Sequence, residues 1–224
     1  MPCTAKKFEC ERPEMRSSGY QDVDAVLTTR ELARMLREAG IDPTALEPAA
    51  YDAPLGIGTG AAVIFGATGG VMEAALRTVY EVVMKKELPS LDFREVRGFE
   101  GIKEAEVALG DTTVRVAVAH TLGNARRLLE RVRSGEASYH FIEIMACPGG
   151  CIGGGGQPIG TNTERRLERI DAIYQADRDL PLRKSHDNPE VKQLYEEFLG
   201  EPLGHKSHEL LHTHYTARGV WPKR

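Results

Sequence analysis

Two cysteines in a glycine-rich loop are the residues of this sequence best suited to chemistry. Cys147 and Cys151 are separated by Pro-Gly-Gly at 148–150, and four more glycines follow at 153–156. These small residues leave no bulky side chain between the thiols, and they let backbone N–H groups approach anionic sulfur closely. The pattern is typical of an iron–sulfur ligand loop. A flexible loop with two buried thiols would have the same spacing.

Other metals fit this loop less well. A radical-SAM cluster would need a further cysteine three residues after Cys151, where Gly154 stands. A closed zinc site would need two more Cys or His ligands. His120 and His140 stand in strand-like segments, where packed or surface histidines are the simpler interpretation. An iron–sulfur cluster is therefore favoured.

Cys3 is a second candidate ligand at the other end of the sequence. Lys6 and Lys7 follow it, and lysines beside a thiol favour the metal-binding thiolate. Taken alone, the segment would be interpreted as a frayed end with an inert cysteine. Cys10 has no comparable setting and is predicted to be a bystander thiol. No export signal is visible, so we expect a reducing compartment, in which disulfides are disfavoured.

The composition excludes several classes of protein. The 224 residues include 29 Lys and Arg against 33 Asp and Glu, a formal net charge of −4, and 41% are hydrophobic. These values are close to globular averages and argue against wholesale disorder. The acidic balance argues against a nucleic-acid or anionic-membrane partner. No apolar run reaches the ~20 residues that span a bilayer, and no signal peptide is seen, so a cytoplasmic location is expected.

The elements around the loop predict an α/β fold with a parallel or mixed sheet flanked by helices. Helical spacing of apolar residues predicts helices at 29–39, from Gly69 to Lys86, and from Leu122 to Gly135. Apolar alternation predicts strands at 112–120 and 139–145, with shorter strand candidates at 23–27, 61–65 and 92–98. The strand at 139–145 runs directly into the cysteine loop. Residues 41–70 are rich in Pro, Gly and Ala, so a long functional or disordered loop is expected there.

The character of the sequence changes after the glycine run. Residues 161–224 predict helices at 163–177, 189–199 and 205–213, and strand patterns are lost. We therefore divide the chain into an α/β part at 1–160 and a small helical appendage at 161–224. The appendage is too small to fold alone and is expected to pack on the first part.

Four segments together resemble the iron-only (FeFe) hydrogenases. MPCTAKKFE at 1–9 and EIMACPGGCIGGGGQP at 143–158 are similar to the second and third signature loops of that family. GAAVIFGATGGVMEAALR at 60–77 resembles its central stretch, and residues 161–215 resemble its small-subunit-type helical tail. The resemblance covers essentially the whole chain. The sequence of these segments is most similar to the catalytic subunits of multimeric NAD(P)-linked enzymes, including electron-bifurcating ones.

The resemblance implies a hydrogenase with an elaborate iron cofactor. In the family, a 4Fe–4S cluster is bridged by one cysteine to a two-iron unit that carries CO, cyanide and a dithiolate. The resemblance implies that Cys3 and Cys147 ligate the 4Fe–4S cluster. It implies that Cys151 ligates this cluster and also bridges to the two-iron unit. Lys6 would bind a cyanide of the distal iron, because an ammonium is a compact donor for a buried anion.

Further residues receive supporting roles from the same resemblance. Met1 and Met145 would pack against the two-iron unit, and Phe65 would help to line its pocket. Ordinary core packing would explain these three residues equally well. Glu9 and Glu143 would orient neighbouring groups, unless they lie on a solvated face.

The first signature loop of the family, a TSCCP-type segment, is absent from this sequence. In the family it supplies the fourth cluster cysteine and a neighbouring cysteine that shuttles protons. We therefore expect a fragment or one half of a split enzyme that is inactive alone. It would need a segment or chain with that loop and maturation factors. Its electron-transfer partners would be separate subunits or ferredoxin, with NAD(P)-linked subunits as one option. The alternatives are an H₂- or redox-sensing module, a eukaryotic-type iron–sulfur assembly protein, and an inactive truncation. Lys6 and the Met145-Ala-Cys147 segment argue against the assembly protein, because they fit a two-iron site.

Overall fold

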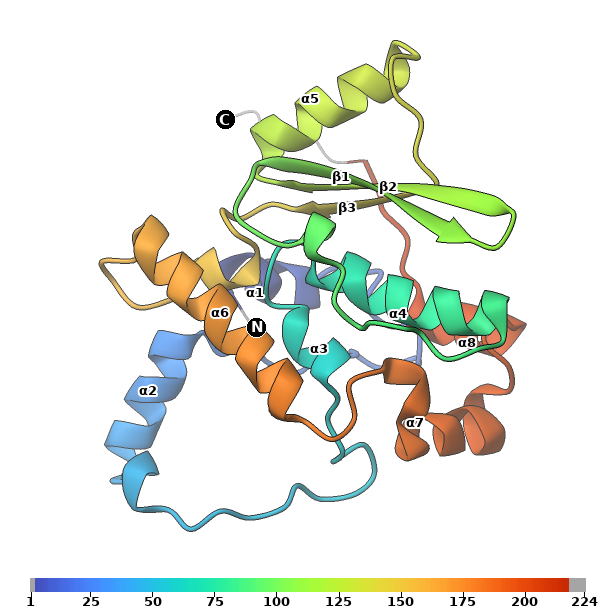
Figure 1. Ribbon diagram of the computed structural model, residues 1–224. Helices are drawn as coiled ribbons and strands as arrows, with labels where there is room; N and C mark the ends of the chain where they lie inside the picture. The colour runs from blue at the N-terminus through green and yellow to red at the C-terminus, as the bar shows by residue number, and fades with distance from the viewer. Residues whose placement is uncertain (1–2, 218–224) are drawn as a thin grey trace.

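A small mixed sheet lies on a layer of helices in the computed structural model, which describes residues 3–217 (Figure 1). The strands are β1 Ile102–Leu109, β2 Thr112–His120 and β3 Phe141–Met145, in the order β1-β2-β3. β1 and β2 form an antiparallel hairpin, whereas β2 and β3 are parallel. The predicted α/β class with a mixed sheet is confirmed.

The connection between the parallel strands brings two strand ends together. Helix α5, Leu122–Arg133, joins β2 to β3 and covers the outer face of the sheet (Figure 1). In the parallel register His120 pairs with Met145, so the carboxyl ends of β2 and β3 lie side by side. The cysteine loop starts directly after Met145. In α/β sheets this edge is where functional groups are usually presented.

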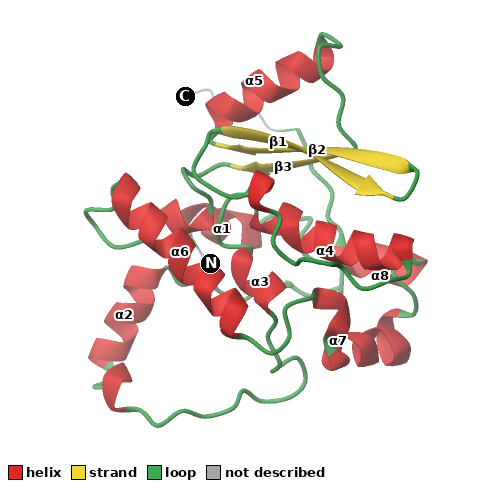
Figure 2. Cartoon of the chain, viewed as in Figure 1, coloured by secondary structure: helices red, strands yellow, loops and turns green. Residues whose placement is uncertain are grey.

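Helices cover the opposite face of the sheet (Figure 2). The remaining α-helices are α1 Thr4–Cys10, α2 Thr29–Glu38, α3 Gly60–Ile64, α4 Gly70–Met84, α6 Thr163–Asp179, α7 Pro189–Leu194 and α8 His205–Leu211. Short 3₁₀ turns stand at Pro43–Ala45, Arg94–Val96, Cys151–Gly153 and Ser185–Asp187, and a π-helical turn at Tyr195–Leu199. Among residues 3–217 we find no helix that combines the length and apolar content needed to cross a bilayer.

Two apolar clusters join the helices to the sheet and to each other. Met72 and Leu76 of α4 pack against Val116 and Val118 of β2, which fixes the helical layer beneath the sheet. A second cluster joins α3, α6 and the cysteine loop, and its members are Ala61, Ile64, Ala67, Ala74, Ile152, Ile170, Ile173 and Tyr174. Because Ile152 follows Cys151 directly and is fully buried, this cluster anchors the loop in the core.

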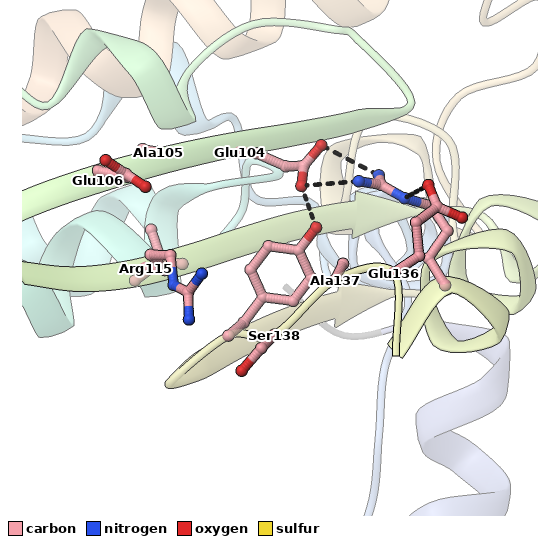
Figure 3. Close-up of a pocket in the computed structure, with 10 residues that line it drawn as sticks. Glu104, Ala105, Glu106, Arg115, Glu136, Ala137 and Ser138 are labelled. Carbon is pink, nitrogen blue, oxygen red and sulfur yellow. Dashed lines mark hydrogen bonds and ion pairs between the residues drawn. The ribbon is translucent and has the colours of Figure 1, made fainter. Parts of the chain in front are cut away.

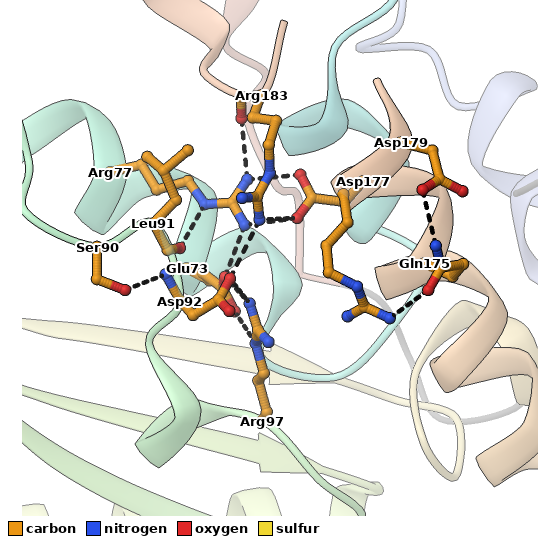
Figure 4. Close-up of polar contacts among 11 residues, drawn as sticks. Glu73, Arg77, Ser90, Leu91, Asp92, Arg97, Gln175, Asp177, Asp179 and Arg183 are labelled. Carbon is orange, nitrogen blue, oxygen red and sulfur yellow. Dashed lines mark hydrogen bonds and ion pairs between the residues drawn. The ribbon is translucent and has the colours of Figure 1, made fainter. Parts of the chain in front are cut away.

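A buried ion-pair network holds the C-terminal helices on the α/β part (Figure 4). Arg77 of α4 is fully buried, and its guanidinium donates to both carboxylate oxygens of Asp177 in α6 at 2.8 Å. Glu73, one turn earlier in α4, accepts from Arg77 at 2.7 Å. Arg97 and Arg183 extend the network to Glu73 and Asp177 respectively. The expectation that the appendage packs on the first part agrees with these contacts.

Several strand predictions were wrong. Residues 61–65 contribute to helix α3, because the Thr59 hydroxyl accepts from the Ala62 N–H at 3.3 Å and starts a helix there. Residues 92–98 contain only the short turn around Val96, and 23–27 have no regular structure. The predicted structureless stretch at 41–70 contains α3. Strand β1 and helix α1 were not predicted.

Candidate metal centre

Backbone contacts bring the two ends of the candidate site together. The Thr4 N–H donates to the Gly155 carbonyl at 3.0 Å, so the start of α1 lies against the glycine run. The Arg30 N–H donates to the next carbonyl, that of Gly156, at 3.2 Å. Cys3 has an extended backbone just before α1 and is buried. Thr4 and Gly155, which are 151 residues apart in the sequence, are therefore joined at this point.

The predicted ligands converge around the glycine run. A Cβ placed on Gly154 would lie 3.3 Å from the Cys3 Cβ and 3.9 Å from the Cys147 Sγ. Cys3 and Cys147 therefore both lie next to this glycine. The Lys6 Nζ, less than one helical turn after Cys3 in the chain, lies 3.8 Å from the Cys151 Sγ. The structure thus brings Cys3, Cys147, Cys151 and Lys6 into one neighbourhood.

The electrostatics agree with this convergence. Burial raises the pKa of the Cys147 thiol, and the nearby Cys3 and Cys151 thiols raise the same pKa further. The Gly155 N–H and the Lys6 ammonium act in the opposite direction and lower the Cys147 pKa. Ionising three neighbouring thiols in a partly buried space is unfavourable without a counter-charge, so the arrangement favours thiolates only with a bound cation or cationic cluster.

The donor set has the chemistry of an iron–sulfur site. Within the described range 3–217, no three His, Cys, Asp or Glu side chains are arranged to hold one metal ion. A single zinc ion needs its sulfur ligands about 2.3 Å from the metal and therefore in close contact with each other. A cluster of four irons is wider, so its thiolates stand further apart. Soft thiolates, a neighbouring N–H donor on Cys147 and an ammonium beside Cys151 are the groups such a cluster requires.

The cysteine loop is held by hydrogen bonds on every side. The Gly149 N–H donates to the His120 Nδ1 at 3.2 Å, and the Gly149 carbonyl accepts from the Thr68 N–H at 3.0 Å. The Ile152 carbonyl accepts from the Arg169 guanidinium of α6 at 2.8 Å. Sequence reasoning missed these contacts of Thr68 and Arg169, and it treated His120 only as a packed or surface residue. The one available signal was the position of His120 at the end of a strand predicted to lie beside the loop.

The remaining predicted site residues have varied settings. Met145 is half-buried, and its Sδ would lie 2.8 Å from a Cβ on Gly150, so it packs against the loop. Phe65 is 45% exposed and caps helix α3 instead of lying in a buried strand. Its neighbour Gly66 accepts a hydrogen bond from the Ile152 N–H. Met1 lies outside the described residues.

Three further residues were discussed from the sequence. Glu143 is buried, and its carboxylate accepts from the N–H groups of Gly69 and Met72 at 2.6 and 2.8 Å. It therefore orients the start of α4, and the solvated-face interpretation of this residue was wrong. Glu9 is half-buried on α1. Cys10 is buried, and its thiol donates to the Lys7 carbonyl within α1 at 3.1 Å, consistent with a bystander.

A surface pocket lies away from the cysteines, between the β1–β2 hairpin and the segment that leads into β3 (Figure 3). Its Arg131 pairs with Glu104 at 3.0 Å and with Glu136 at 3.1 Å, and Tyr139 donates to Glu104. Arg131, Glu104 and Glu136 therefore satisfy one another's charges. The pocket contains no thiol and is separate from the candidate metal centre.

Comparisons with known protein families give a consistent picture. Residues 1–155 match the family described as "Iron only hydrogenase large subunit, C-terminal domain". Residues 163–218 match the family described as "Iron hydrogenase small subunit".

Individual relatives and solved structures agree with the family matches. The NADP-reducing hydrogenase subunit HndD of Solidesulfovibrio fructosivorans is 54% identical over 97% of this chain, which spans 37% of HndD. Cytosolic iron–sulfur assembly component 3 of Mus musculus is 32% identical over 97% of this chain and 46% of its own length. A variant of the FeFe-hydrogenase HydA1 from Chlamydomonas reinhardtii is 44% identical, with a TM-score of 0.79 over 98% of this chain and 63% of that structure. The chain thus spans less than two thirds of each.

Proposed function

Because this chain belongs to the iron-only hydrogenase family, we propose that it forms part of a catalytic subunit for reversible H₂ oxidation. The observation that carries the proposal is the convergence of three thiols and one ammonium around the glycine run. When bound, a 4Fe–4S cluster joined to a two-iron unit with CO, cyanide and dithiolate ligands would supply the redox chemistry that interconverts H₂ with protons and electrons.

Within this proposal, the residues of the chain hold and insulate the cofactor. Cys3 and Cys147 are proposed ligands of the 4Fe–4S cluster, and Cys151 is proposed to ligate it and to bridge to the two-iron unit. Lys6 would donate a charge-assisted hydrogen bond to an anionic ligand beside Cys151, which its 3.8 Å separation from that thiol supports. The Met145 thioether would help to exclude water from the cofactor site.

Three further assignments belong to the same proposal. Phe65 is proposed to line the pocket of the two-iron unit. The same role is proposed for Met1. The division into an H-cluster part at 1–160 and a small-subunit-type tail at 161–224 remains a proposal as well.

The likeness to a hydrogenase subunit favours this activity over iron–sulfur assembly. Identity to HndD is 54%, compared with 32% to the mouse assembly component. Lys6 beside Cys151 also supports a two-iron unit, because an ammonium there would serve as a donor to an anionic ligand of that unit.

The proposed partners follow from the same likeness. A segment or separate chain with the first cysteine loop would supply the fourth thiolate. NAD(P)-linked electron-transfer subunits are proposed because HndD is described as a subunit of an NADP-reducing hydrogenase. Ferredoxin and maturation factors complete the set, and a cytoplasmic location stays a prediction.

Coexpression tests the activity. We expect that this chain, produced with a chain that carries the missing loop and with maturation factors, evolves H₂ and has infrared bands from iron-bound CO and cyanide. This chain alone is expected to be inactive. A complex that is fully loaded with iron yet lacks those bands would contradict the two-iron assignment.

Substitution of Lys6 tests the site. Lys6→Ala is expected to lose the infrared bands of the two-iron unit and nearly all H₂ evolution, while the 4Fe–4S signal in electron paramagnetic resonance is largely kept. Lys7→Ala is the matched control, because the Lys7 ammonium instead bonds the Val26 carbonyl and pairs with Glu31. Unchanged activity of Lys6→Ala, or equal loss in both variants, would remove Lys6 from the site.

A further inference from the structure

His120 lies between the sheet and the cysteine loop. It is the last residue of β2, is only 4% exposed, and stands opposite Met145 in the parallel register. Its ring packs against the Phe99 ring with centroids 5.1 Å apart. A histidine so deeply buried must have partners for both ring nitrogens, or it would carry the cost of an unsatisfied polar group.

The two hydrogen bonds of this ring fix one tautomer. The Gly149 N–H lies 3.2 Å from Nδ1 and is able only to donate, so Nδ1 must present its lone pair. The Phe99 carbonyl lies 3.1 Å from Nε2 and is able only to accept, so Nε2 must carry the proton. The arrangement is consistent only with a neutral ring protonated on Nε2.

The residue that His120 holds is the midpoint of the cysteine loop. Gly149 stands two residues after Cys147 and two residues before Cys151. Its carbonyl accepts from the Thr68 N–H at 3.0 Å, so both sides of its backbone are bonded. Its φ of +77° favours glycine, and a Cβ there would lie 2.7 Å from the Phe99 ring. Hydrogen bonds and steric contact therefore fix the position of the Gly149 backbone.

We propose that His120 is a positioning residue for the metal centre: its neutral Nε2–H tautomer holds the Gly149 N–H and so sets the separation of the Cys147 and Cys151 thiols. That the separation of the thiols matters to a bound cluster rests on the proposed function. The hydrogen bond from Gly149 to His120 does not, and it can be measured in the metal-free chain.

Nuclear magnetic resonance of the ¹⁵N-labelled full chain without metal tests the inference directly. We expect His120 to be protonated on Nε2, and we expect a ¹⁵N–¹⁵N coupling across the hydrogen bond from the Gly149 amide to Nδ1. Absence of the coupling, together with an Nδ1-protonated or doubly protonated ring at neutral pH, would overturn the inference.

Amide exchange of Gly149 gives a second measurement. His120→Leu removes the acceptor, and we expect exchange at Gly149 to become at least about tenfold faster. His120→Asn places an amide oxygen near the position of Nδ1, and we expect it to restore most of the protection. Leucine and asparagine variants with the same Gly149 exchange rate as the parent would contradict the proposal.

His140 is a matched control on the neighbouring strand segment. Its Nδ1 also accepts a backbone N–H, that of Arg115, at 3.0 Å, but far from the cysteine loop. We expect His140→Leu to accelerate exchange at Arg115 and to leave Gly149 unchanged. Equal acceleration of Gly149 in both leucine variants would indicate general loosening and would overturn the specific role of His120. If His120→Leu fails to fold, the tautomer and coupling of the parent chain decide the question.

The loaded complex separates this inference from the proposed function. If the parent complex binds no cluster although the Gly149 coupling is present, the proposed function fails and the hydrogen bond stands. If the parent binds a cluster, His120→Leu is expected to change its electron paramagnetic resonance spectrum and reduction potential, and His120→Asn to change them less. A cluster unaffected by both variants would contradict positioning.

Discussion

Three consecutive glycines at 153–155 lie where a side chain would meet another part of the candidate metal centre. A Cβ on Gly153 would be 2.1 Å from the Pro148 carbonyl oxygen, which belongs to the cysteine loop itself. A Cβ on Gly155 would be 2.2 Å from the Thr4 hydroxyl. The missing side chains therefore allow the loop to fold back on itself and allow the start of α1 to approach it.

The most restrictive of these glycines gives a prediction. Gly153→Ala must displace backbone, because the obstructing atom is a main-chain carbonyl and not the end of a flexible side chain. We expect a destabilisation of about 1–3 kcal/mol, typical of overpacking, measured by urea unfolding. We also expect faster alkylation of Cys147 and Cys151 in the metal-free chain, measured by mass spectrometry.

Gly123→Ala is the control for this substitution. Gly123 lies in α5, and a Cβ there would meet no atom within 4 Å, so alanine is expected to be neutral or slightly stabilising. Alkylation rates of the loop cysteines should not change. A Gly153→Ala variant as stable as Gly123→Ala would contradict the steric argument.

At the residue scale, the sequence predicts the groups that carry chemistry better than the groups that hold them. Cys147 and Cys151 are recognised from residue type and spacing, and their closeness to Lys6 agrees with the family resemblance. His120 has no such signature, because its role depends on the register of β2 against β3, which places it under Gly149. A hydrogen bond between a side chain and a distant backbone group leaves no pattern in the sequence.

The junction of β1, β3 and α4 buries two opposite charges. The Glu143 carboxylate of β3 binds the first N–H groups of α4, where the helix dipole favours a negative charge. The Lys103 ammonium of β1 donates to the Thr68 and Gly98 carbonyls at 3.1 and 3.0 Å. Burial lowers the Lys103 pKa to about 8, although Glu143 acts to raise it. Burial also raises the Glu143 pKa, against the effect of its hydrogen bonds.

This junction predicts a pH dependence of stability. Lys103 has a folded pKa of about 8 and an ordinary value of 10.5, so the unfolded chain binds more protons between these pH values. Stability from this group therefore rises with pH across that window, and below pH 8 the cost of burying the charge is fully present. The predicted gain is about 3.5 kcal/mol at most, since each pKa unit corresponds to about 1.4 kcal/mol.

Comparison with Lys103→Met isolates the effect. We expect the free energy of unfolding of the parent chain, measured by urea titration from pH 7.5 to 10.5, to rise relative to that of Lys103→Met. The variant should also be less stable at pH 10.5, because it leaves the Thr68 and Gly98 carbonyls without this donor. Parallel pH profiles of the two chains would show that Lys103 titrates as an exposed lysine.

The same junction explains which elements the sequence predicted. β2 was predicted because apolar residues alternate with polar or small residues along 112–120, whereas β1 carries Lys103, Glu104 and Glu106 among its eight residues. One of those charges is buried and the others face solvent, so the alternation of a half-buried strand is disguised. In 61–65, a short apolar run resembled a strand, and only the cap at Thr59 distinguishes it as a helix.

The C-terminal helices are integrated with the α/β part through buried charge. Asp177 is fully buried in α6 and binds Arg77 of α4 through two hydrogen bonds, as Figure 4 shows. The Arg97 guanidinium lies 4.2 Å from the centre of the Tyr174 ring in α6. Gly60 allows α3 to approach, since a Cβ there would lie 1.9 Å from the Asp177 carboxylate. The appendage therefore completes the core and is not attached only at its surface.

A second set of ion pairs continues this contact along α4. Glu81 accepts from Lys184 at 2.9 Å and from His186 at 2.8 Å, and both partners belong to the C-terminal region. The Arg169 contact with the Ile152 carbonyl links the same region to the cysteine loop. The sequence predicted the helices of this region from their apolar spacing, but these charged contacts join residues about 100 positions apart and leave no local signal.

Asp177→Asn tests whether the two regions unfold together. The substitution removes the charge that faces buried Arg77, and breaking a buried pair in this way typically costs about 3–5 kcal/mol. Asp179→Asn is the matched control on the same helix, because Asp179 is exposed and accepts a hydrogen bond from Gln175 in its own α6. We expect the control to change stability by less than about 0.5 kcal/mol. Both are measured by urea unfolding, followed by circular dichroism and by limited proteolysis between residues 160 and 217.

A single shifted transition with coincident probes means that buried charge joins the helices and the sheet into one cooperative unit. A variant in which only the C-terminal helices become protease-sensitive, with the main transition unmoved, would mean that the network fixes the appendage without supporting the cysteine loop.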